Sequence, residues 1–159
     1  ALTLPRELSV KDGRVLQKPI RELTGLRQEV LLDGALEAER DYKLGRTAEL
    51  ELTFTEKAEG VLLLLTDGEK NLQLSLEAGG RFVVSRNTKD GERAAVLRST
   101  QPLKLQLFLD KSSVELFVGD GELTFTERVY WQNDVQCRLL TQADNQAKAW
   151  RLESESNQY

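Results

Sequence analysis

Hydrophobic and polar residues alternate along the segment from Leu103 to Arg128, and the alternation is interrupted at two points. A period of two is typical of a strand with one buried face, so we expect three antiparallel strands joined by tight turns. Lys111-Ser112 is placed to form the first turn, and Asp120-Gly121, a dipeptide that favours type I′ hairpins, the second. The pairs that these turns predict are Leu109 with Val114, Leu107 with Leu116, Leu105 with Val118, Val118 with Leu123, and Leu116 with Phe125. One face of the three strands is therefore expected to be continuous core.

The opposite face of the same strands mixes aromatic, charged and hydroxyl side chains. Its members are Phe108, Glu115, Phe117, Thr124, Thr126 and Arg128, and Tyr130 and Trp131 follow directly. Phe108 and Phe117 are diagonal neighbours, and we expect an ion pair between Glu115 and Arg128 beside them. Either another segment of this chain covers the surface, or it contacts another domain or a ligand.

Most of the remaining chain also consists of short apolar segments between turn residues. Strands are expected at residues 30–32, 36–39, 49–55, 61–65, 72–76, 82–84, 93–98, 135–141 and 147–152. The four between residues 61 and 98 follow one another closely enough to form a meander. In the last strand we expect Trp150 and Leu152 to face the core and Ala149 to face away. Pro19 precedes a pattern that permits one or two helical turns.

These elements predict an all-β protein. The favoured architecture is a two-sheet antiparallel β-sandwich, a concanavalin- or lectin-like jelly roll, and the alternative is a closed barrel. No repeat or linker divides the chain, and its 159 residues suit one domain. We therefore expect residues 1–159 to form a single β-sandwich domain.

Composition excludes several functions. Charged residues make up 30% of the chain, with a net charge of -4 and both signs interspersed, which argues against a nucleic-acid partner. No apolar run approaches the roughly 18 residues of a membrane span, so no membrane partner is expected. Cys137 is the only cysteine, and we expect a buried structural thiol. Together with the absence of a signal peptide and of Asn-x-Ser/Thr sequons, this favours a cytoplasmic location.

The sequence offers little independent chemistry. It contains no histidine, the commonest general base and metal ligand, and no nucleotide-binding or nucleophile motif. Its many carboxylates are expected to form a solvated face, and the acidic turns match no calcium-binding loop. Glu127 is exceptional because the predicted register places it on the core side, opposite Val114. We expect a bulge or strand end to return its side chain to water. The alternative is a buried carboxylate with an ion-pair partner. We therefore predict no catalytic, cofactor-binding or metal-binding residue.

Two parts of the chain resemble a known family. The strings DKSSVELFV (110–118), DGE (120–122) and FTER (125–128) resemble the C-terminal signature of glycoside hydrolase family 32, the β-fructofuranosidases. LTLPREL (2–8) and QKPIREL (17–23) are similar to the segment where that family's chain leaves its catalytic domain. Gly119 stands where the family often has asparagine, and Trp131 where it often has proline.

The resemblance implies a β-sandwich appended to a catalytic five-bladed propeller. The family's catalytic motifs, of the types NDPNG, RDP and EC, do not occur here, so no catalytic residue is carried over. The chain is expected to be the non-catalytic C-terminal module of a bacterial sucrose or sucrose-6-phosphate hydrolase without its propeller. Its expected role is to brace the propeller, its partner, or to support a homo-oligomer. Arg6, Glu7 and Arg128 are expected to lie towards the propeller.

Two other functions remain open at this point. In the first, the chain is a carbohydrate-binding module for fructans or other sugars, with Tyr130 or Trp131 as an aromatic platform. In the second, it is a lectin-like structural protein that acts alone. The surface predicted for any of these contacts comprises Arg6, Glu7, Phe108, Phe117, Arg128, Tyr130 and Trp131.

Overall fold

The computed structural model describes residues 5–86, 91–99 and 102–152, and nearly all of its regular structure is strand. The strands are β1 (Arg6–Lys11), β2 (Arg14–Pro19), β3 (Arg27–Gly34), β4 (Asp41–Gly45), β5 (Ala48–Phe54), β6 (Gly60–Thr66), β7 (Asn71–Leu76), β8 (Arg81–Ser85), β9 (Glu92–Val96), β10 (Lys104–Leu109), β11 (Ser113–Val118), β12 (Leu123–Arg128), β13 (Val135–Leu139) and β14 (Asn145–Leu152). A short 3-10 helix, η1 (Arg21–Leu26), lies where helical turns were expected after Pro19.

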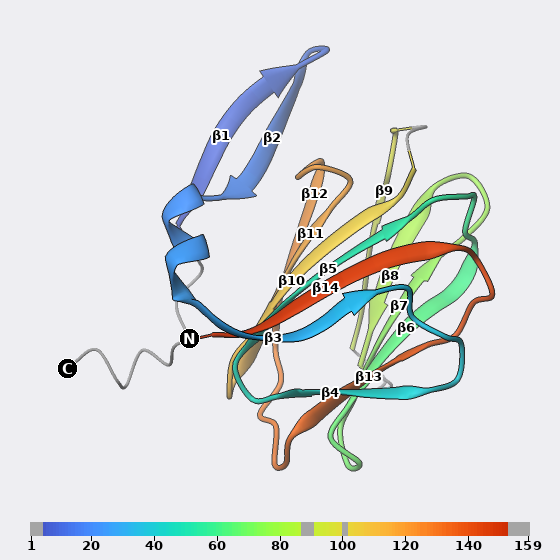
Figure 1. The fold of residues 1–159 in the computed structure, drawn as a ribbon. Helices are drawn as coiled ribbons and strands as arrows, with labels where there is room; N and C mark the ends of the chain where they lie inside the picture. The colour runs from blue at the N-terminus through green and yellow to red at the C-terminus, as the bar shows by residue number, and fades with distance from the viewer. Residues whose placement is uncertain (1–4, 87–90, 100–101, 153–159) are drawn as a thin grey trace.

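Two six-stranded antiparallel sheets pack against each other (Figure 1). The first sheet has the order β12-β11-β10-β5-β14-β3, and the second has the order β4-β13-β6-β7-β8-β9. The β-sandwich prediction is confirmed. The closed-barrel alternative is wrong because the strands form two separate sheets. The predicted meander is confirmed as β6 to β9, four consecutive neighbours in the second sheet.

The register predicted for Leu103 to Arg128 is confirmed at all five pairs. The first turn is closed by a hydrogen bond from Asp110 N to Ser113 O of 3.0 Å. In the second turn Asp120 and Gly121 both have positive φ, 56° and 91°, as a type I′ turn requires. Local turn chemistry therefore fixes this part of the sheet.

The core lies between the sheets and draws on both. Phe54 of the first sheet and Phe82 of the second are among the largest fully buried side chains. Phe82 also contacts Phe125, with ring centroids 5.7 Å apart, and so links β8 to β12. Burial of each such ring stabilises the fold by roughly 1.5–3 kcal/mol.

Two elements differ from the sequence prediction. Residues 36–39 form no strand beyond an isolated bridge between Ala38 and Leu139, and β4 takes the edge position instead. In β14, Ala149 is buried in the main core, whereas Trp150 lies opposite Glu49 on the other face of the sheet. The prediction for this strand was wrong by one residue, which inverts every side chain. Trp150 and Leu152 are buried by Arg27 and by the small second cluster on the outer face, whereas the small side chains Ala147 and Ala149 face the core, so side-chain size gave the wrong face.

β1 and β2 form a separate two-stranded hairpin that projects from the sandwich (Figure 1). η1 connects this hairpin to β3.

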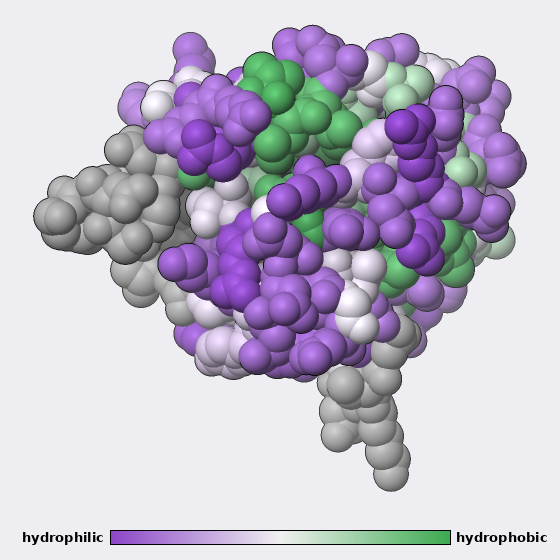
Figure 2. Space-filling view, turned by 60° about the horizontal axis from the view of Figure 1, so that its bottom comes forward, coloured by the Kyte–Doolittle hydropathy of each residue, from purple (hydrophilic) through white to green (hydrophobic). Residues whose placement is uncertain are grey.

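In the described part of the chain, no helix has the length and hydrophobicity needed to cross a membrane. The face drawn in Figure 2 is mainly hydrophilic, with hydrophobic side chains confined to a few patches.

Candidate functional site

The outward surface of the first sheet, which we call the outer face, carries the mixed residues predicted from the sequence. Phe108 and Phe117 meet edge to face there, with ring centroids 6.1 Å apart, and Leu152 joins them in a small second core. Leu23 and Leu26 of η1 pack against this cluster. The chain therefore covers its own aromatic pair, and the Phe108 and Phe117 rings are only 7% and 3% exposed.

Arg6 attaches the base of the hairpin to the outer face. Its Nη2 lies 3.3 Å from Glu115 Oε2, and its guanidinium lies 5.4 Å from the centroid of the Phe117 ring. Its Nη1 donates to Gln17 Oε1 at 2.8 Å, and its Nη2 to Thr126 Oγ1 at 3.4 Å. Arg6 thus forms an ion pair with the buried Glu115, for which Arg128 was the predicted partner. A guanidinium suits this place because it combines several donors with a planar face.

Two further contacts hold the hairpin. Gln17 N donates to Gly121 O at 2.9 Å, and Arg14 Nη1 lies 3.1 Å from Glu122 Oε1. Gly121 is required there, since a Cβ at this position would lie 2.1 Å from Gln17 O. The hairpin is therefore fixed along β2, next to the β11–β12 turn.

Beyond these contacts the hairpin exposes an apolar surface. Leu8 and Val10 are 71% and 73% exposed, and Val15, the cross-strand partner of Val10, is 58% exposed. These three residues share one face of the hairpin by strand alternation and pairing. We call them the hairpin patch.

A charged network occupies the middle of the outer face. Arg27 Nε and Nη2 bind both carboxylate oxygens of Glu49 at 2.8 and 2.7 Å, and Nη2 also reaches Glu51 at 3.0 Å. The guanidinium stacks 3.7 Å from the centroid of the Trp150 ring. Hydrogen bonding to Glu49 is the main cause that raises the pKa of Arg27. Burial, followed by the charge of Glu49, raises the pKa of Glu51.

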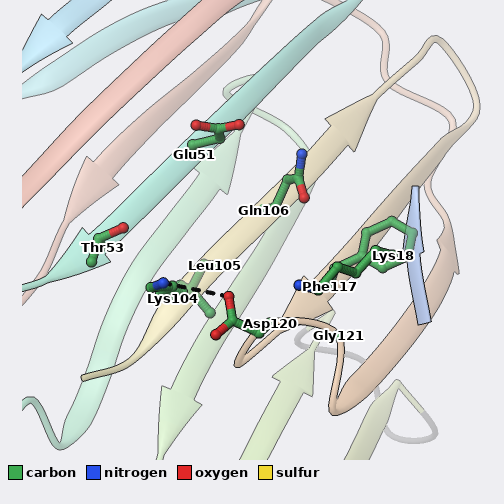
Figure 3. Close-up of a pocket in the computed structure, with 9 residues that line it drawn as sticks. All are labelled: Lys18, Glu51, Thr53, Lys104, Leu105, Gln106, Phe117, Asp120 and Gly121. Atoms are coloured by element: carbon green, nitrogen blue, oxygen red, sulfur yellow. Dashed lines mark hydrogen bonds and ion pairs between the residues drawn. The ribbon is translucent and has the colours of Figure 1, made fainter. Parts of the chain in front are cut away.

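A groove of about 310 Å³ opens beside this network (Figure 3). We call it the β5–β10 groove, and it is lined by Lys18, Glu51, Thr53, Lys104, Leu105, Gln106, Phe117, Asp120 and Gly121. Lys104 Nζ lies 3.4 Å from Asp120 Oδ1 across one end, and Gln106 Nε2 donates to Glu49 Oε2 at 2.9 Å. β2 of the hairpin contributes Lys18 as one wall.

The structure separates the remaining predicted site residues. Glu7 is exposed on the hairpin, and Arg128 is exposed at the end of β12, where its Nη1 lies 3.4 Å from the Tyr130 hydroxyl. Tyr130 is 55% exposed. Trp131, however, is only 4% exposed and belongs to the main core, so its prediction as a sugar platform is wrong.

Glu127 is a buried, paired carboxylate, which was the alternative to the expected exposure to water. It faces the core side opposite Val114 and is 2% exposed. Its Oε2 lies 3.5 Å from Arg86 Nε, and its Oε1 lies 3.3 Å from Arg93 Nε. Burial raises the pKa of Glu127, while the charges of Arg93 and Arg86 oppose the change. Arg86 directly follows β8 and Arg93 lies on β9, so both arginines reach Glu127 from the other sheet.

The Arg27 network and the hairpin patch were not predicted from the sequence. Glu49 and Glu51 alternate with core leucines, which predicted a solvated face, and only the pairing of β5 with β10 and β14 shows what surrounds them. The alternation of Leu8 and Val10 was the one available signal for the patch. Among the described residues, no cluster of histidine, cysteine, aspartate and glutamate is placed to hold a metal ion.

The fold and this surface define a β-sandwich module with an attached, partly apolar hairpin. Residues 22–154 match the family model described as "Glycosyl hydrolases family 32 C terminal". The chain belongs to this family of C-terminal domains.

Known proteins similar to the chain are much longer. A raffinose invertase of Escherichia coli is 35% identical over 84% of this chain and 30% of its own length. A sucrose-6-phosphate hydrolase of Streptococcus mutans is 32% identical over 88% of this chain and 30% of its own length. A solved GH32 beta-fructofuranosidase of Bombyx mori superposes with a TM-score of 0.80, at 27% identity, over 95% of this chain and 32% of its own. The chain thus spans about a third of the length of these relatives.

Proposed function

We propose that this chain is the non-catalytic C-terminal module of a bacterial β-fructofuranosidase that cleaves sucrose or sucrose 6-phosphate, and that it braces the catalytic region through the hairpin patch. Leu8, Val10 and Val15 carry the proposal. They lie on a two-stranded hairpin, an element that is marginal in water unless something covers it. The module's relatives are about three times as long, so most of each relative lies outside the matched region, and the corresponding region of the parent enzyme is the proposed partner of the patch. The expected sandwich domain of residues 1–159 and its propeller partner are part of this proposal.

A parent enzyme carrying the module provides the test. The coding sequence upstream of Ala1 is read first, and the proposal expects a catalytic region there. In that full-length enzyme, serine is introduced at Leu8, Val10 and Val15, and sucrose hydrolysis is followed during heating. We expect faster loss of activity than in wild type, because the patch no longer holds the catalytic region. Val96→Ser is the matched control, since Val96 is a 57% exposed valine of β9, in the second sheet, and is not part of the hairpin patch.

Two results contradict the proposal. Hydrolysis of sucrose by the isolated 159-residue chain would show that it is not a non-catalytic module. Identical heat inactivation of the patch variant and the Val96→Ser control would show that the hairpin does not brace the catalytic region. We further propose a cytoplasmic location, supported by the single, buried Cys137; recovery of the parent enzyme from the extracellular fraction of its native host would contradict it.

Sugar binding is the second candidate function. The β5–β10 groove favours it because polar side chains of both hydrogen-bonding types line a concave site. Tyr130 alone provides weaker support, because an exposed aromatic ring without a groove gives little specificity.

A further inference from the structure

We propose that the β5–β10 groove binds a neutral sugar at Glu51, Thr53, Lys104 and Gln106. This inference rests on the second candidate function and assigns it a place, away from the aromatic residues that follow β12. The strand pairing puts Glu51 opposite Gln106 and Thr53 opposite Lys104, so the four side chains form a two-by-two array on one face. Figure 3 shows them beside the hairpin wall.

The array suits the hydroxyl groups of a sugar. Neighbouring strands are about 4.8 Å apart, so adjacent polar ends are spaced for bridging by successive hydroxyls of one ring. Glu51 accepts hydrogen bonds, Lys104 donates them, and Thr53 and Gln106 do both. The volume of about 310 Å³ lies at the lower end of the roughly 300–1,000 Å³ typical of small-molecule sites.

The charges lining the groove favour a neutral ligand. Two ammonium groups, Lys18 and Lys104, face two carboxylates, Glu51 and Asp120. The Lys104 ammonium is already paired with Asp120 at 3.4 Å. A phosphate would meet the carboxylates as well as the lysines, whereas a neutral hydroxyl can bond either kind of group.

The array is held in place before any ligand arrives. Gln106 is fixed by its hydrogen bond to Glu49, and Glu51 by its contact with Arg27. Arg27 is itself held by the two hydrogen bonds that it donates to Glu49 and by its contact with the Trp150 ring. Side chains held in this way lose little conformational freedom on binding, which lowers the entropic cost of recognising a sugar.

Nuclear magnetic resonance titration of the 159-residue chain with sucrose tests the inference. We expect saturable shifts at the backbone amides of Thr53 and Lys104 and at the side-chain amide of Gln106. Thr53→Val and Glu51→Gln should each weaken binding by about tenfold, as loss of one hydrogen bond or one charged acceptor implies. Glu29→Gln is the matched control, because Glu29 is an exposed glutamate of the same sheet that pairs with Arg151 outside the groove. It should leave the affinity unchanged.

Three outcomes would overturn the assignment. The first is amide chemical shifts that change linearly up to tens of millimolar sucrose, without saturation. The second is saturable chemical-shift changes centred on Tyr130 instead of the groove. The third is tighter binding of sucrose 6-phosphate than of sucrose. None of them bears on the bracing role, which is measured by heat inactivation of the full-length enzyme. Conversely, groove binding by the isolated chain would stand even if the hairpin variants inactivated normally.

Discussion

Asp67 ties the turn between β6 and β7 to the loop before β13, and its replacement measures what this tie contributes to stability. Its Oδ1 accepts hydrogen bonds from the backbone N–H groups of Glu69 at 2.9 Å and Lys70 at 2.7 Å. Its Oδ2 accepts those of Gln132 at 2.6 Å and Asn133 at 3.3 Å. Burial raises the pKa of Asp67, but the four N–H groups outweigh it and lower the pKa from its ordinary 3.8 to about 2.

The magnitude follows from the two pKa values. At about 1.36 kcal/mol per pKa unit, the difference between 3.8 and about 2 corresponds to roughly 2 kcal/mol in favour of the ionised, folded state. Because the folded pKa is depressed, this stabilisation is complete above pH 3.8 and is lost as the pH falls towards about 2. Asp67→Asn removes the charge and turns an amide N–H₂ towards backbone donors. We therefore expect it to cost at least about 2 kcal/mol at neutral pH.

Urea unfolding of wild type and Asp67→Asn at a series of pH values provides the measurement. The difference in unfolding free energy should be largest at neutral pH and should shrink between pH 3.8 and about 2. Asp33→Asn, at an exposed position on β3, should stay within about 0.5 kcal/mol of wild type. A difference for Asp67→Asn that is independent of pH would refute the reasoning, because it would show that the ionised carboxylate is not what the N–H groups stabilise.

Three further variants or modifications test other parts of the fold. Gly121→Ala should destabilise the chain and speed proteolysis of the hairpin, since the new Cβ would clash with Gln17 O. Gly13→Ala is the control: its φ is also positive but nothing lies within 4 Å, so it should cost only the roughly 1 kcal/mol of backbone strain. Equal losses of unfolding free energy in the two variants would contradict the clash. Glu127→Gln should be at least as stable as wild type to urea at neutral pH. Burial raises the pKa of this carboxyl above its ordinary 4.5, so keeping it ionised at neutral pH costs the folded state stability. The stability advantage of the variant should vanish in acid, where the wild-type carboxyl is protonated. Burial raises the pKa of the Cys137 thiol to about 12, so it should react with iodoacetamide only when the chain unfolds, and rapid native alkylation would disprove its burial.

Local patterns predicted the hairpins well, because turn residues and alternating side chains specify the same register. Leu103 to Arg128 is the clearest case, since Asp120-Gly121 fixes the turn and every predicted pair is present. The family signature lies in this segment too, which is why the fold class followed from the sequence.

Non-local pairing explains most of what was missed. Nothing near Trp150 and Leu152 in the sequence shows that Arg27 and the Phe108–Phe117 pair bury them on the outer face, and this burial is what made the small Ala149 the core-facing residue. Glu127 was assigned to water because a buried carboxylate is costly alone, but its ion-pair partners Arg86 and Arg93 lie far from it in the sequence. The candidate site depends on the same kind of contact, since the groove joins β2, β5 and β10.

The long sequence separation between Arg6 and Glu115 determines when the hairpin can dock onto the sandwich during synthesis. The two residues are separated by 109 positions, and a ribosome adding about 5–20 residues per second needs roughly 5–20 s to cover that distance. Throughout this interval the hairpin has emerged but its docking strands have not. If a catalytic region precedes the module, as proposed above, Leu8, Val10 and Val15 would be available to that region before their own sandwich has been synthesised.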